Sequence, residues 1–142
     1  MYSPKHFSVE ELVPPDIFDD RGSLALNAMD ERVLRTLDTL RDAFGVCTVN
    51  NWSFGGNLTE RGLRTPGCKH YSPYSQHTFG RAIDCTFKGS TAEDIRRSVI
   101  KSKALFPHIS FIEDAVDWFH FDVRNGRRIQ LWNPNTHDSL YV

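Results

Sequence analysis

Residue types that could bind a metal ion occur in two short stretches of the chain. The first reads S-Q-H-T-F-G-R-A-I-D at residues 75–84, where His77 ends a glycine-rich loop and Asp84 lies in a strand-like segment. The second contains His120, which is surrounded by aromatic residues. Two imidazoles and one carboxylate are a recurrent ligand set for catalytic zinc, and they leave a fourth position for water. Zinc lowers the pKa of that water towards ~7 and makes it a nucleophile at neutral pH.

We therefore expect His77, Asp84 and His120 to bind Zn²⁺. The spacing alone leaves a second interpretation open, because a His-x6-Asp pair often arises by chance. A histidine between Phe119 and Phe121 is more often a core residue than a ligand. This second interpretation is a metal-free core, and it predicts that no metal is bound.

The two stretches together resemble a family signature. S-x-H-x-x-G-x-A-x-D at 75–84, followed by D-x-x-H at 117–120, is similar to the pattern of the zinc D-Ala-D-Ala carboxypeptidases and dipeptidases. That superfamily includes phage endolysins and the zinc-containing signalling domain of hedgehog. The resemblance extends from about residue 7 to about residue 124, and N-N-W at 50–52 and G-L-R-T-P at 62–66 are similar to compact phage and prophage members.

The resemblance implies a zinc peptidase with a hedgehog-like fold that hydrolyses a peptide bond in the peptidoglycan stem peptide. Relatives cut either the terminal D-Ala-D-Ala bond or a bond inside the stem. The setting that it implies is phage-related lysis of the bacterial cell wall. A second function class is a non-catalytic zinc-containing module for binding or virion assembly on the same fold. An open coordination position with a carboxylate nearby would favour the enzyme.

The resemblance also implies roles for individual residues. Asp117 matches the general base that takes a proton from the zinc-bound water. Arg64 matches an arginine that polarises the scissile carbonyl, and one such donor is typically worth ~3–4 kcal/mol in the transition state. The residues that we expect to contact substrate are Ser75, Gln76 and Trp118.

The identity of the general base stays open on geometric grounds. Side chains alternate along a strand, so Asp117 and His120 point to opposite faces. Asp117 reaches the metal only if the chain turns or bulges just before residue 118. The alternatives for the base are Glu113, Asp114 and Asp122.

Of the remaining histidines and cysteines, few are expected to take part in the site. We expect surface positions for His6, His70, His108 and His137, of which His70 is the best candidate to line the cleft. Three cysteines, Cys47, Cys68 and Cys85, form neither a disulfide framework nor a zinc knuckle. Cys85 follows Asp84 directly and is expected to face the core.

Composition limits the possible function classes. The 142 residues indicate one domain, with 39% apolar and 25% charged residues. A net charge of -1 gives no field that would hold nucleic acid, and no apolar run approaches the ~20 residues of a membrane span. Residues 1–10 lack the apolar region of a secretory signal peptide. We expect synthesis in the cytoplasm and delivery to the cell wall by another protein. The sequence gives no indication of oligomeric state.

The order of predicted elements indicates an α+β domain, residues 1–142, with a small antiparallel sheet and two or more helices packed on it. Residues 1–25 are expected to form an irregular N-terminal wrap. Apolar residues at three- and four-residue steps predict a helix from about residue 30 to 44, and a capping box at 90–93 predicts a second helix. A long loop is expected at 50–75. The predicted strands are 46–49, 81–87, 109–112, 118–123 and 129–132.

Overall fold

The longest helix forms where the apolar periodicity predicts it. In a computed structural model that describes all 142 residues, α2 (Glu31–Phe44) buries Val33, Leu34, Leu37 and Leu40. The Asp30 carboxylate accepts the N–H of Arg32 and caps the first turn. Gly45, with φ +89°, ends the helix.

The second predicted helix, α3 (Ala92–Lys101), begins one residue later than expected. Its N-cap is Thr91, and Asp94 completes the capping box in place of the predicted pair Ser90 and Glu93. Ser90 is instead bridged to Phe87 across the preceding turn, so its backbone belongs to that turn and not to the helix.

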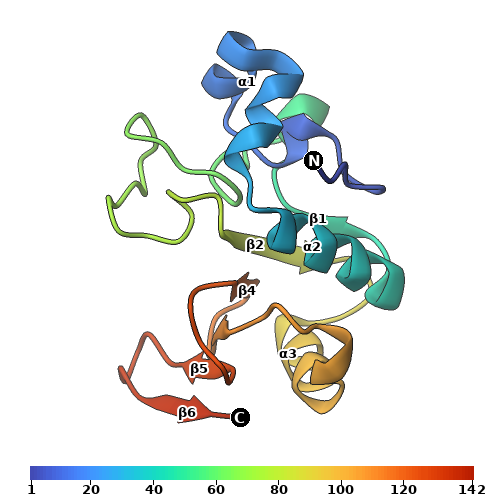
Figure 1. Cartoon of the computed structure of the whole chain (residues 1–142), viewed down its shortest axis with the longest axis vertical. Coiled ribbons are helices and arrows are strands. Elements are labelled where there is room, and N and C mark those ends of the chain that lie inside the picture. The colour runs from blue at the N-terminus through green and yellow to red at the C-terminus, as the bar shows by residue number, and fades with distance from the viewer.

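A single six-stranded sheet forms the other layer (Figure 1). Its order is β1-β2-β4-β3-β5-β6, and every pair is antiparallel except β3 and β5. The fold is therefore mixed α and β, as expected for α+β, but the prediction of a purely antiparallel sheet was wrong. The connection after β4 brings β5 to the outer side of β3, where the two strands run parallel. The strands are β1 (Cys47–Thr48), β2 (Ala82–Phe87), β3 (Phe111–Glu113), β4 (Phe119–Asp122), β5 (Gln130–Trp132) and β6 (Ser139–Tyr141).

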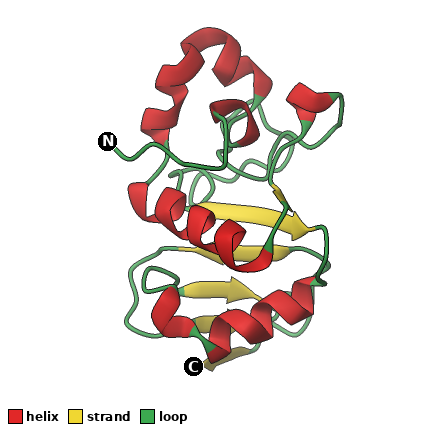
Figure 2. Ribbon diagram, turned by 90° about the vertical axis from the view of Figure 1, so that its right-hand side faces the viewer, coloured by secondary structure: helices red, strands yellow, loops and turns green.

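The two faces of this sheet have different chemistry. Figure 2 shows α2 and α3 side by side over one face. The residues that face them are apolar, and Ile83, Cys85, Phe119 and Phe121 all belong to one buried core. The intervening residues of β2 and β4 include the polar side chains, which lie on the face away from the helices. Cys85 is fully buried, as predicted.

The N-terminal segment is helical and not irregular. It contains the 3₁₀ turns Val9–Glu11 and Gly22–Ala28 and the helix α1 (Pro15–Arg21), which form the end of the molecule farthest from β6 (Figure 1). Pro15 occupies the first helical position, where its missing N–H costs nothing, and this explains how a Pro-Pro pair can open a helix. Two further 3₁₀ turns are Trp52–Phe54 and Lys103–Leu105.

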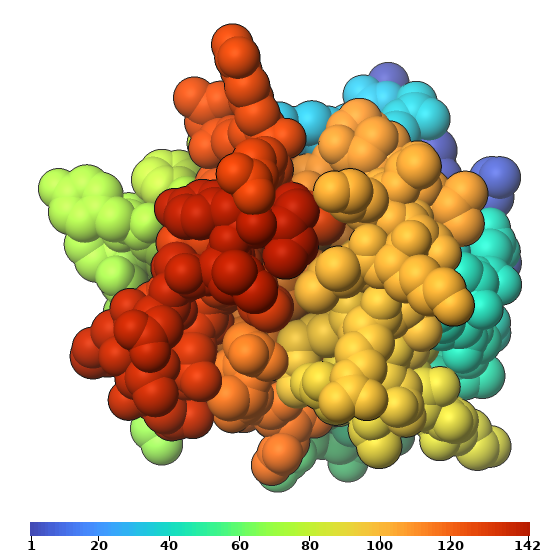
Figure 3. Space-filling model, turned by 90° about the horizontal axis from the view of Figure 1, so that it is seen from below, coloured from blue at the N-terminus to red at the C-terminus, as the bar shows by residue number.

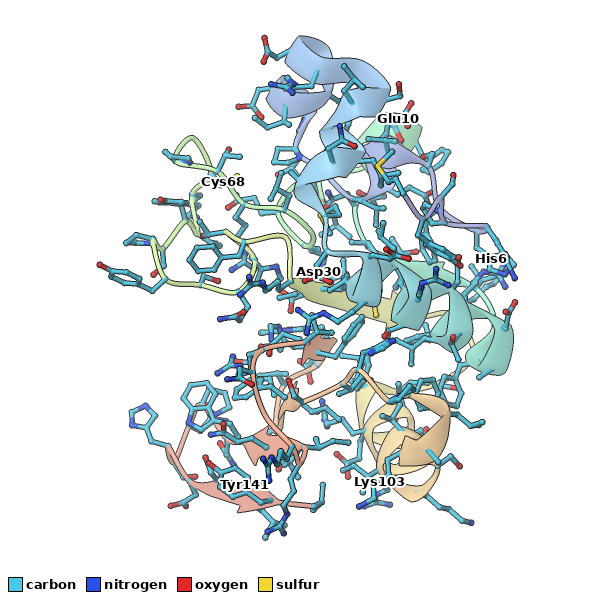
Figure 4. The ribbon with its side chains drawn as sticks, in the orientation of Figure 1. His6, Glu10, Asp30, Cys68, Lys103 and Tyr141 are labelled. Atoms are coloured by element: carbon cyan, nitrogen blue, oxygen red, sulfur yellow. The ribbon has the colours of Figure 1, made fainter.

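The N-terminal helical segment contacts the sheet at the point where β2 begins. Asp30 donates its backbone N–H to the carbonyl of Gly80, which has φ +66°. A Cβ atom at residue 80 would lie 1.9 Å from the carbonyl oxygen of Ala28, so only glycine fits. Figure 4 labels Asp30 at this junction and Cys68 in the long loop beside it.

At the end of the molecule away from α1, the C-terminal strands and α3 occupy separate parts of the surface (Figure 3). The strand β6 was not predicted, because its three residues are exposed at the sheet edge and show no buried alternation. No helix in the chain combines the length and the apolar character that crossing a membrane would require.

Candidate metal centre

The pairing of β2 with β4 brings together two of the predicted ligands. Asp84 and His120 are opposite one another in the antiparallel register, and His120 Nδ1 lies 2.7 Å from Asp84 Oδ1. His77 arrives from the loop before β2, with Nε2 3.4 Å from Asp84 Oδ2. All three residues are buried, and one ligand atom from each lies within 4.8 Å of the others. No fourth His, Cys, Asp or Glu joins this group.

The hydrogen bonds of the two imidazoles suit metal binding. His77 Nδ1 lies 2.8 Å from the carbonyl oxygen of Gly62, so the N–H is on Nδ1 and the Nε2 lone pair faces Asp84. His120 Nε2 lies 3.2 Å from Asp122 Oδ2, so Nδ1 is the atom left for a metal. Metal-binding histidines usually donate their second N–H in this way. The three residues can therefore hold a metal ion.

Burial and hydrogen bonding shift the pKa values of these three residues in opposite directions. Burial raises the pKa of the Asp84 carboxyl, but the hydrogen bond from His120, together with the neighbouring His77 imidazole, outweighs this and keeps the pKa well below its usual range. Burial lowers the pKa of His77. Burial also lowers the pKa of His120, but hydrogen bonds to Asp122 and Asp84 outweigh it and raise the pKa to about 9. Without metal, both ring nitrogens of His120 are therefore protonated at neutral pH, and a metal ion must displace the proton on Nδ1.

Asp122 and Arg124 hold the His120 ring through its Nε2 side. Asp122 is fully buried and accepts two hydrogen bonds from the Arg124 guanidinium, at 2.8 and 2.6 Å. Burial raises the pKa of Asp122, but the bonds from Arg124 and His120 outweigh it and lower the pKa. Arg124 in turn stacks over the ring of Phe111 at 3.6 Å, and that ring meets His120 edge-on.

Two predicted site residues, Arg64 and Ser75, lie in the long loop next to the group of His77, Asp84 and His120. Arg64 donates from Nη2 to Asp84 Oδ2 at 3.0 Å and from Nε to the carbonyl of Glu60 at 2.7 Å. Ser75 accepts the backbone N–H of His77 at 3.3 Å. Arg64 therefore faces the ligand carboxylate, and Ser75 positions the start of the ligand loop.

An open cleft of about 350 Å³ exposes the ligand group to solvent. Its walls include Ser75, Arg64 and the exposed His70, which was the best cleft candidate among the remaining histidines. Three further wall residues were not assigned from the sequence: Phe111, Arg124 and Trp132. Phe111 lies two residues from Glu113 on the same strand and so shares its face, and Trp132 is paired with Glu113 in the register of β3 and β5.

The expected general base, Asp117, lies outside this cleft. It is exposed, makes no side-chain hydrogen bond or ion pair, and lines a separate pocket with Thr91, Glu93 and Arg96 near the start of α3. The chain bends over residues 115–118, where Arg96 donates from Nη1 to the carbonyls of residues 116 and 118.

Of the three alternative carboxylates, only Glu113 is free and in the cleft. Asp114 is paired with Arg96 at 3.5 Å, and Asp122 is held by Arg124. Glu113 lines the cleft and makes no hydrogen bond or ion pair through its side chain. The register of β3 with β4 pairs residue 111 with residue 122, which places Glu113 opposite His120 on the same face.

The two remaining predicted substrate contacts differ in position. Trp118 lines the cleft, and its indole Nε1 is buried without a hydrogen-bond partner. Gln76 is half-buried and does not line the cleft, and its Oε1 is also buried without a partner.

The chain matches no protein-family model, and neither the curated proteins nor the solved structures contain a significant match to it. The functional argument accordingly depends on the residues and on the geometry of the cleft.

Proposed function

We propose that the protein is a zinc-dependent peptidase that hydrolyses a peptide bond in the peptidoglycan stem peptide, as a carboxypeptidase or an endopeptidase. The observation that carries the proposal is a buried group of His77, Asp84 and His120 at an open cleft. The proposed setting is cell-wall lysis by a phage or prophage, on a hedgehog-like fold, with delivery by another protein.

The donor set supports zinc and a catalytic site. Two imidazoles and one carboxylate suit zinc better than they suit magnesium or calcium, which prefer oxygen ligands. Structural zinc sites are usually closed by four protein ligands, whereas catalytic ones keep a position open. Here three residues form the group and the cleft reaches them from solvent.

Residues of the chain supply the proton transfer and charge stabilisation. The metal would activate water and polarise the scissile carbonyl. In the proposal, Glu113 accepts the proton from the attacking water and delivers it to the leaving amine, because it is the free carboxylate in the cleft. The Arg64 guanidinium faces the same space and stabilises the negative charge that develops on the carbonyl oxygen.

One observation favours the second candidate, a non-catalytic zinc-containing module for binding or virion assembly. The carboxylate that the family resemblance assigns as base, Asp117, is outside the cleft. If Glu113 does not replace it, the site holds metal without a group that can transfer a proton.

Digestion of peptidoglycan separates the two candidates. Purified protein with one equivalent of zinc is incubated with cell-wall sacculi, and the released fragments are identified by mass spectrometry. The peptidase should release stem-peptide fragments, and His120→Ala should release none and bind no zinc in elemental analysis. Fragment release by His120→Ala would contradict the proposal, as would zinc-loaded wild type that releases nothing. His108→Ala, outside the cleft, is the matched control.

A further inference from the structure

The loop between β3 and β4, residues 114–118, is held by a helix on the side of the sheet away from the cleft. That helix is α3 (Figure 2), and the side chain of its Arg96 is only 6% exposed. The Arg96 guanidinium donates from Nη1 to the carbonyl oxygens of Val116 and Trp118, at 3.1 and 3.3 Å. Its Nε lies 3.5 Å from Asp114 Oδ1. One guanidinium therefore contacts three alternate residues of the loop.

The loop also contains a strained residue. Ala115 has φ +56°, a left-handed conformation that is unfavourable for any residue with a Cβ atom. Such a conformation persists only where the surrounding structure imposes it. Apart from Arg96, the only side chain outside the loop that forms a hydrogen bond to it is Asn135, whose Nδ2 lies 3.5 Å from the Ala115 carbonyl oxygen. Arg96 is therefore the main side-chain support of the loop in this conformation.

The two residues at the ends of the loop that line the metal cleft are fixed in different ways. The indole Nε1 of Trp118 is buried without a hydrogen-bond partner, so no hydrogen bond of its own holds the ring. The side-chain hydrogen bond that this residue does receive comes from Arg96 to its carbonyl. Glu113 lies in β3 and is paired with Trp132 of β5, so the sheet fixes its backbone. The position of Trp118 thus depends on Arg96, whereas that of Glu113 does not.

We infer that Arg96 is a positioning residue, which places the Trp118 wall of the cleft from the opposite side of the sheet; this rests on the proposed function, in which Trp118 contacts the substrate. Arg96 does not line the cleft and forms no hydrogen bond to a metal ligand, so it acts only through the loop. Its loss should weaken substrate binding, while zinc binding and proton transfer by Glu113 remain.

Steady-state kinetics with a stem peptide test this role on the zinc-loaded protein. Arg96→Met keeps the apolar stem and removes the donors, and it should raise KM about 3- to 10-fold, the size of one aromatic contact, with kcat and zinc affinity near wild type. Arg96→Lys should raise KM less, because an ammonium reproduces only part of the guanidinium fork. Arg97→Met is the matched control, since Arg97 is the next residue of α3 and pairs with the same Glu93 but is exposed.

A second substitution separates positioning from a general loss of stability. Glycine adopts a positive φ without strain, so Ala115→Gly removes the drive for the loop to rearrange when Arg96 is absent. Arg96→Met combined with Ala115→Gly should therefore bring KM back towards the wild-type value. If Arg96 only stabilised the fold, KM per folded molecule would be the same in all of these variants.

NMR of the Trp118 indole N–H, assigned with Trp118→Phe, tests the placement whether or not the protein is active. Arg96→Met should shift this resonance, Arg97→Met should leave it in place, and the added Ala115→Gly should reverse the shift. A resonance that does not move would overturn the role of Arg96, as would an unchanged KM in active Arg96→Met. Failure of every form to cleave peptide, with the resonance moving as described, would instead overturn the proposed peptidase. If Arg96→Met does not fold, Arg96→Lys is used for both measurements.

Discussion

The imidazole Nε2 of His120 lies 3.2 Å from the carboxylate of Asp122, two residues along the same strand. This contact fixes the ring and leaves Nδ1 for a metal ion. A carboxylate behind a ligand histidine is typically worth 10- to 100-fold in metal affinity. We therefore expect Asp122→Asn to bind zinc about 10- to 100-fold more weakly than wild type, measured by competition with a chromophoric chelator. Asp138→Asn, at an exposed position, should not change the affinity, and an unchanged Asp122→Asn would remove the role assigned to this contact.

Glu113 and Asp117 give opposite predictions for the proton-transfer step. Glu113→Gln should lower kcat by about 10²- to 10⁴-fold while zinc binding remains, because the amide cannot accept a proton. Asp117→Asn should keep kcat near the wild-type value, since this side chain lies outside the cleft. Both are measured on the same peptidoglycan substrate with metal content checked in parallel. The reverse pattern would restore Asp117 as the base and would require the loop to rearrange when metal or substrate binds.

The close approach of Gly80 to Ala28 makes a prediction about stability. Gly80→Ala places a Cβ against a backbone carbonyl at a positive φ, and we expect it to lower the free energy of unfolding by about 3 kcal/mol or more. Gly55 also has positive φ but faces open space, so Gly55→Ala should cost only ~1 kcal/mol. Urea unfolding of the two variants measures the difference, and equal losses would show that the contact does not matter.

The Asp30 cap of α2 predicts how stability changes in acid. Hydrogen bonding from the Arg32 side chain lowers the pKa of Asp30 below its usual value, so this carboxylate stabilises the folded state above that usual value, near pH 4. The contribution is lost as the pH falls through the lowered pKa. Asp30→Ala should therefore be less stable than wild type by ~1 kcal/mol at pH 7, and the gap should narrow towards pH ~2. Urea midpoints at both pH values measure it, and a gap that is constant with pH would contradict the ionic part of the argument.

The sequence predicted the helix α2 well because its determinants are local. A capping aspartate, an apolar period and a terminal glycine all lie within a few residues of Asp30 and Gly45. The grouping of His77, Asp84 and His120 was also predicted, from their residue types and from the family resemblance. What brings Asp84 opposite His120 is a strand register, and side-chain alternation gave their faces correctly.

The features that depend on distant pairing could not be derived in this way. The parallel pairing of β3 with β5 follows from where the chain returns after β4, and no local residue encodes it. Asp117 was ranked first on the family resemblance, whereas the contacts that Arg96 makes with the carbonyls of residues 116 and 118 come from a distant helix and could not be derived from spacing. Glu113 reaches His120 only through cross-strand register, so its sequence position alone could not rank it above the other carboxylates.

The strict alternation along β2 and β4 restricts where this chain can vary in length. Each of these strands contributes core residues on one side and a member of the Asp84–His120 pair on the other, so the removal or addition of a single residue within either strand would exchange the two sets. Such a change would move aromatic rings into water and acidic groups into the interior in one step. Natural variants of this scaffold should therefore differ in length in the segment between residues 55 and 75 and at the β5–β6 edge, while the two central strands tolerate substitution but no change in length.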